Sequence, residues 1–169
     1  PISKNMDKRA LDAAMDYWNK GKKIYLSSGS DQHDVTSILY PGIIRTYAHV
    51  DGKVSPQSYM AALKAGNSYV TMGPIITPAA NSMFGSTRTI KAGETVALNT
   101  ELQAVHGLKS IEVYSEGKPA GKKEFNNTTD AVTYTFEASP EKDTWYNFVV
   151  MDGKGRYAVT NPVWVEVKK

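Results

Sequence analysis

The sequence predicts an α+β protein in which the last βα units of an α/β barrel are followed by an antiparallel β-sandwich. Two observations support this division. Helical periodicity alternates with short apolar runs up to Pro74, and it is absent after that residue. The later part consists instead of short β-rich runs separated by turn residues. We therefore assign residues 1–74 to a barrel remnant and residues 75–169 to a β-sandwich domain.

The first part contains two such units. A helix is expected over residues 7–20, because apolar side chains recur on one face at three- and four-residue spacing: Leu11, Ala14, Met15 and Trp18. A strand over 24–26 and a small polar loop over 27–33 follow. In α/β barrels the loops at the carboxyl ends of strands carry the chemistry. The second unit combines a strand over 43–50 with a helix that starts at Ser55 and Pro56 and stops at Gly66.

Beyond Pro74 we expect strands over residues 95–98, 110–114, 131–136, 145–151, 157–160 and 163–167. The Asp152-Gly153 pair between two alternating runs predicts a hairpin. Two βα units cannot close a barrel, so sheet edges and apolar faces should remain exposed. The apolar face of the first helix should then lie against the sandwich, a second copy or solvent.

The composition limits the function. Apolar residues make up 41%, which suffices for a folded core, and no apolar run approaches the ~18 residues of a membrane span. The net charge of +3 is too small to predict nucleic-acid binding. Cysteine is absent, so any metal would be held by His and carboxylates. The compartment stays undetermined, and an extracytoplasmic location remains open.

Asp31 and His33 are the main candidate site residues. Side chains two residues apart in an extended loop point to the same side, so this carboxylate and imidazole can meet one metal ion. Oxygen and nitrogen ligands suit Zn, Mn or Fe. The alternative is an Asx turn beside an exposed histidine.

The segment Gly29-Ser30-Asp31-Gln32-His33 resembles the last metal motif of the PHP (polymerase and histidinol phosphatase) domain, a distorted seven-stranded α/β barrel. Residues 40–47 (YPGIIRTY), 62–74 (ALKAGNSYVTMGP) and 160–163 (TNPV) extend the resemblance to the C-terminal half of PHP metallohydrolases of the carbaryl-hydrolase-like (CehA/McbA) type. The resemblance implies metal ligation by Asp31 and His33. It also implies hydrolysis of phosphoester or carboxylic/carbamic ester bonds in small molecules, with a cluster of divalent metals.

The chain departs from that family in its histidines. The family's barrel opens with a His-x-His pair and adds further His and Glu ligands, whereas this chain has only His33, His49 and His106. Two ligands cannot assemble a multi-metal site. We therefore expect the chain to be an inactive fragment whose main partner is the missing N-terminal part of the same protein. A homo-oligomer is a further expected form.

Other polar residues have weaker functional interpretations. Arg45 is a candidate for binding an anionic substrate group, although an ion pair with Asp51 or another acid is the favoured explanation. Asp34 is a candidate for supporting the metal ligands or is an exposed loop acid. We interpret His49 and His106 as structural, and Lys20, Lys22 and Lys23 as a solvated helix end.

A second class of function is a β-sandwich binding or spacer module, with a glycan or protein partner and no catalysis. Trp145, Tyr146 and Trp164 would offer aromatic faces to a sugar. Their positions in alternating strands also fit ordinary core packing, which is the commoner use of such residues.

Overall fold

The computed structural model of the chain describes residues 6–34 and 41–168. Its helices are α1 (Met6–Asn19), α2 (Pro56–Ala65) and the short 3₁₀ helix η1 (Ala80–Ser82). The strands are β1 (Arg45–Ala48), β2 (Ser68–Thr71), β3 (Ile75–Pro78), β4 (Thr87–Lys91), β5 (Val96–Gln103), β6 (Leu108–Ser115), β7 (Lys118–Thr128), β8 (Val132–Ala138), β9 (Thr144–Asp152), β10 (Tyr157–Thr160) and β11 (Val163–Lys168).

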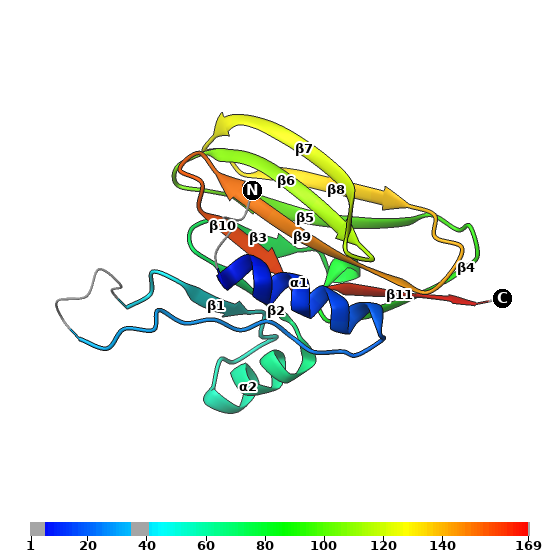
Figure 1. Cartoon of the computed structure of the whole chain (residues 1–169), viewed down its shortest axis with the longest axis horizontal. Helices are drawn as coiled ribbons and strands as arrows, with labels where there is room; N and C mark the ends of the chain where they lie inside the picture. Colours follow the sequence, from blue (N-terminus) through cyan, green and yellow to red (C-terminus); the bar gives the residue numbers. More distant parts are fainter. Residues whose placement is uncertain (1–5, 35–40, 169) are drawn as a thin grey trace.

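The strands form a sandwich of two sheets (Figure 1). Among the described residues, the larger sheet has eight strands in the order β1-β2-β10-β9-β11-β4, with β6 pairing to β9 and β7 to β6. The smaller sheet has the order β3-β5-β8. Every pairing is antiparallel except that of β11 with β4. Strand β9 is the centre of the larger sheet, because it pairs with β6, β10 and β11.

The core between the sheets follows from the two-residue period of the strands. Leu98 and Leu102 of β5 face Ile111 and Val113 of β6 and Phe148 of β9 within one buried cluster, and all five are fully buried. Burying an aliphatic or aromatic side chain of this size contributes about 1.5–3 kcal/mol. This inner core is therefore the main source of stability.

Helix α1 covers the outer face of the larger sheet. Its apolar side, Leu11, Ala14, Met15 and Trp18, packs in a second buried cluster on Trp145, Val149, Val159 and Trp164. Trp18 meets Trp145 edge-on, with ring centres 5.1 Å apart. The helix predicted over 7–20 is confirmed, and of the three expected positions for its apolar face the structure shows the one against the sandwich.

Helix α2 has the ends that its sequence predicts. Ser55 is the N-cap, with its hydroxyl accepting from the Ser58 amide, and Pro56 follows at the first helical position. The helix stops at Gly66, which has a left-handed φ of 76°. Of its ten residues only Ala62 is buried, so α2 lies at the side of the sandwich rather than in its core (Figure 1).

The expected barrel remnant is wrong. Barrel strands run parallel to their neighbours, whereas β1 and β2, which flank α2, pair antiparallel, and β2 continues antiparallel into β10. The expected strand over 24–26 is also not a strand. The physical reason is that β2 has buried residues on both faces: Tyr69 belongs to the inner core and Val70 packs against the outer cluster. A position inside the larger sheet, between β1 and β10, allows both side chains to pack against apolar neighbours.

The β-sandwich itself is confirmed, as are the hairpin at Asp152-Gly153, which joins β9 to β10, and the strands expected beyond Pro74. Strands β3, β4 and β7 were not predicted. Tyr40, part of the resemblance, lies outside the described residues. Within the described ranges, neither α-helix is long and apolar enough to cross a bilayer.

Candidate functional site

Asp31 and His33, which were predicted to share a metal ion, lie close together. The Asp31 Oδ1 and His33 Nε2 atoms are 3.0 Å apart, and the two side chains are 82% and 81% exposed. Asp31 has a left-handed φ of 52°, which aspartate tolerates better than most residues. The pair is thus open to solvent, and its facing atoms are the types that bind divalent metals.

A complete metal site is not present among the residues that the structure describes, since no group of three or more His, Cys, Asp or Glu side chains comes together there. Two protein ligands do not close a coordination shell. Asp34 follows the pair, and its backbone carbonyl accepts a hydrogen bond from the side-chain amide of Gln32 at 3.0 Å. Asp31 and His33 therefore fit a metal only as part of a larger ligand set.

Side chains from three elements hold the segment that leads to this pair. The Trp18 indole donates to the Ile24 carbonyl at 2.8 Å, and the Leu26 amide donates to Asn161 Oδ1 at 2.7 Å. The Thr46 hydroxyl both accepts from the Ser28 amide and donates to the Ser28 carbonyl, at 2.8 and 2.9 Å. The backbone of this segment is thus held by a side chain at every second residue, 24, 26 and 28, although no strand of the described residues pairs with it.

Arg45 lies on β1 and is exposed. Its guanidinium is 5.7 Å from the centre of the Tyr47 ring. It forms no ion pair with Asp51 or with any other acid among the described residues; Asp51 instead lies 3.1 Å from His49 Nε2. Arg45 thus keeps a charge available to an anion, and no described contact links it to Asp31 or His33.

The three aromatic residues considered as a sugar platform are packed in the core, which was the favoured interpretation of their positions. Trp145, Tyr146 and Trp164 are only 2%, 5% and 6% exposed. Trp145 lies beneath α1 and donates to Asn19 Oδ1 at 3.0 Å, while Tyr146 packs on Phe136 in the inner core. These rings have no free face for stacking on a pyranose.

A groove of about 550 Å³ lies beside the C-terminal end of α1. Four of its charged side chains form two ion pairs, since Lys23 lies 3.8 Å from Glu166 and Lys142 lies 2.8 Å from Glu116. Lys23 also donates to the Thr87 hydroxyl at 2.9 Å. The expected solvated helix end therefore includes one lysine, Lys23, that is held against the sandwich.

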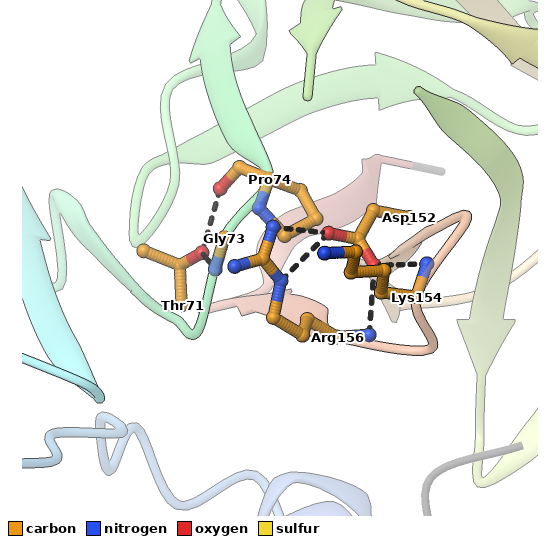
Figure 2. Close-up of polar contacts among 6 residues, drawn as sticks. All are labelled: Thr71, Gly73, Pro74, Asp152, Lys154 and Arg156. Atoms are coloured by element: carbon orange, nitrogen blue, oxygen red, sulfur yellow. Dashed lines mark hydrogen bonds and ion pairs between the residues drawn. The ribbon is translucent and has the colours of Figure 1, made fainter. Parts of the chain in front are cut away.

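Two of the buried polar side chains have roles that were not recognised from sequence. The first is Asp152, which is fully buried and holds the turn between β9 and β10 (Figure 2). One carboxylate oxygen accepts the amides of Lys154 and Arg156, and the other accepts the Arg156 guanidinium at 2.8 and 2.9 Å. Gly73 leaves room for that guanidinium, since a side chain there would lie 3.0 Å from Arg156 Nε. This network is structural, because all its strong acceptors are used internally.

The second is Asn161, in the short connection between β10 and β11. It is fully buried, and its side chain joins Leu26, Gly66 and Ser68. Its partners are far away in sequence, by up to 135 residues, so no local pattern could have indicated this role.

Comparisons with known proteins do not establish a family. No family model and no curated protein matches the chain. Among solved structures, it is similar to the fibronectin(III)-like modules of Clostridium thermocellum CbhA, at 14% identity and a TM-score of 0.39, over 56% of this chain and 96% of that one. A lytic polysaccharide monooxygenase from Jonesia denitrificans aligns over 91% and 93% of the two chains, at 15% identity and a TM-score of 0.41. Similarity at this level says nothing about function.

Proposed function

We propose that this chain is a β-sandwich module without catalysis of its own, and that it binds a protein surface: the upstream part of a longer polypeptide. The observation that carries the proposal is the distribution of exposed large apolar side chains. Of the seven among the described residues, five precede Pro74, namely Tyr17, Ile24, Tyr47, Val54 and Met60, and the two later ones are Ile75 and Val105. Three of the five, Tyr47, Val54 and Met60, lie on β1, on α2 or in the loop between them, so this side of the sandwich has apolar side chains that a protein partner would cover.

A protein partner explains the surface better than a glycan. Protein interfaces are built from apolar side chains around a few anchors, whereas sugar sites need exposed aromatic faces. Val54 is 71% exposed and Met60 is 49% exposed, while Trp145 and Trp164 are buried. Covering side chains such as Val54 and Met60 would contribute about 25 cal/mol for each Å² of apolar area removed from water.

Site-specific crosslinking tests this function. A photoreactive residue is placed at Met60 in the longer polypeptide from which we propose that the chain derives, and the control carries it at Val105, which is 80% exposed on the β5–β6 turn. We expect position 60 to crosslink to residues upstream of Pro1 and position 105 to give no such product. Equal yields from both positions, or none from position 60, would remove the proposal.

A second candidate function rests on the contact between Asp31 and His33. The pair would supply two ligands to the metal centre of a PHP-type hydrolase acting on phosphoester or carboxylic/carbamic ester bonds, and the partner would supply the others. Support comes from the 3.0 Å separation, the exposure of both side chains and the resemblance of residues 29–33 to a PHP metal motif. Since two ligands are insufficient, we expect no hydrolysis of p-nitrophenyl esters or phosphates by this chain.

The chain contains a matched control for the metal test. His49 and Asp51 are the same residue types at the same spacing, 3.1 Å apart. In a Mn²⁺ titration followed by NMR, we expect the His33 ring signals to broaden at lower Mn²⁺ than those of His49. In the longer protein His33→Ala should reduce metal content and rate by orders of magnitude, and His49→Ala should change neither. A His33→Ala enzyme that kept its metals and activity would refute this assignment.

A further inference from the structure

Four distant segments of the chain meet beside α2. They are residues 25–26, the end of α2 at Gly66 with the start of β2 at Ser68, the turn at Gly85, and the β10–β11 connection at Asn161. Gly85 donates its amide to the Pro162 carbonyl at 2.8 Å. A side chain at Gly66 would overlap the Tyr25 ring, and one at Gly85 would overlap the backbone of residues 65–66. The segments approach so closely because these positions are glycine.

Asn161 provides the hydrogen bonds at this junction. Its Nδ2 donates to the Ser68 carbonyl at 3.0 Å, the Ser68 hydroxyl at 2.9 Å and the Gly66 carbonyl at 3.3 Å. Its Oδ1 accepts the Leu26 amide at 2.7 Å. Asn161 is fully buried, so its three bonds to Gly66 and Ser68 are shielded from water, and the bond to Leu26 is partly shielded.

The segment has two other attachments. The two hydrogen bonds between Ser28 and Thr46 are exposed, whereas the one from Trp18 to Ile24 is partly buried, like the one from Leu26 to Asn161. Among the described residues no hydrogen bond is made by the backbone amides of Tyr25 and Ser27. The bond from Leu26 to Asn161 thus links this segment to the connection between β10 and β11 and, through the other bonds of Asn161, to β2.

We propose that Asn161 is a positioning residue, which fixes residues 24–34 on the sandwich and so sets where Asp31 and His33 stand. Its importance for metal binding rests on the second candidate function above. The positioning itself does not, because it concerns the Leu26 amide and can be measured without a metal. The side-chain amide is suited to this task, since it donates to β2 and accepts from the segment at the same time.

Amide hydrogen exchange tests the link in the unmodified chain. We expect the Leu26 amide to exchange at least tenfold more slowly than those of Tyr25 and Ser27. In Asn161→Ala the Leu26 amide should lose that protection, while Val150 in the centre of β9 keeps most of its own. The matched control is Asn99→Ala, which removes a hydrogen bond to Thr135 in the smaller sheet and should leave Leu26 protected.

A Leu26 amide that exchanges as fast as Tyr25 and Ser27 in the unmodified chain would overturn the proposal, even if Asn161→Ala fails to fold. Equal losses at Leu26 and Val150 in Asn161→Ala would also overturn it, because they indicate global unfolding. As a readout at the site, Asn161→Ala should raise the Mn²⁺ concentration that broadens His33 at least threefold. If the unmodified chain shows no preference for His33 over His49, the metal function fails, and Leu26 exchange still decides the role of Asn161.

Discussion

Strand β9 and the segment over residues 22–34 are held in place in opposite ways. β9 is hydrogen-bonded to strands on both sides, and eight of its nine residues are buried. In residues 22–34 none is buried, and side chains of Trp18, Thr46 and Asn161 replace a neighbouring strand. A paired strand opens only with the whole sheet, whereas a segment held by side chains can open alone. The candidate ligands Asp31 and His33 thus stand on the part that is easier to move.

The largest contrast is expected from apolar truncation. Phe148 in β9 is fully buried and lies 6.4 Å from Phe84, measured between ring centres. Phe148→Ala should lower the free energy of unfolding by about 3–5 kcal/mol, because it leaves a cavity in the inner core. Ile24→Ala, at a position that is 40% exposed, should cost less than about 1 kcal/mol. Urea unfolding followed by tryptophan fluorescence measures both, and similar losses would contradict the contrast.

Trp18→Ala should separate local opening from global unfolding. Trp18 is 1% exposed, packs on Trp145 and binds the Ile24 carbonyl. Its loss should weaken the docking of α1 by about 3 kcal/mol. Limited proteolysis of Trp18→Ala should then cut within residues 6–34 first and leave β9 intact. The control is Tyr17→Ala, because Tyr17 is the neighbouring residue and is 46% exposed. This variant should be cut as slowly as the unmodified chain. Simultaneous cleavage of both regions would show that α1 and the sandwich unfold together.

A pair of glycines sharpens the comparison at the junction. Gly66 and Gly52 both have a φ of 76°, so alanine costs about 1–2 kcal/mol at each from backbone strain. Only at Gly66 does the new methyl group meet the Tyr25 ring; the space around Gly52 is open. Gly66→Ala should therefore be more destabilising by about 1–2 kcal/mol and should speed exchange at Leu26. Equal effects in thermal unfolding would mean that Tyr25 moves aside freely.

The smallest effect concerns alkaline pH. Burial beside α1, together with a 2.8 Å hydrogen bond to Glu112, raises the pKa of Tyr114 to about 12. The unfolded state loses the same proton near pH 10, so Tyr114 contributes stability that is fully present below pH 10 and is lost as the pH rises toward 12. Tyr114→Phe should make the fall in stability between pH 9 and 11.5 less steep. Identical slopes in urea unfolding would show that Tyr114 ionises equally in both states.

Local patterns predicted what local forces determine. The helices, the cap at Ser55 and the hairpin at Asp152-Gly153 all depend on neighbours in sequence, and they were predicted correctly. Strand β7 was missed because it is an exposed edge strand, and so lacks apolar alternation. The predicted barrel was wrong because residues 68–71 follow a helix, as a strand of a βα unit does. The strand that β2 pairs with, β10, lies far along the chain, so no local pattern indicates this antiparallel pairing.

The candidate site shows the same limit. The spacing of Asp31 and His33 predicted that both could bind one metal ion, which stays a prediction; the structure shows that the two side chains lie 3.0 Å apart. The residues that hold their segment could not be predicted, because Asn161 contacts it across 135 positions. Asn161 lies in the connection between β10 and β11, and in the folded chain its side chain binds the segment that leads to Asp31 and His33.

The strand order has a consequence for synthesis. The flanks of the larger sheet, β1, β2 and β4, leave the ribosome before β9, β10 and β11, which fill its middle. Thr71 of β2 pairs with Ala158 of β10, which is 158 − 71 = 87 residues later. At ~5–20 residues per second, translation needs roughly 4–17 s to cover that interval. For those seconds β2 has β1 on one side and no partner strand on the other, and an unpaired strand edge is a place where other chains can associate.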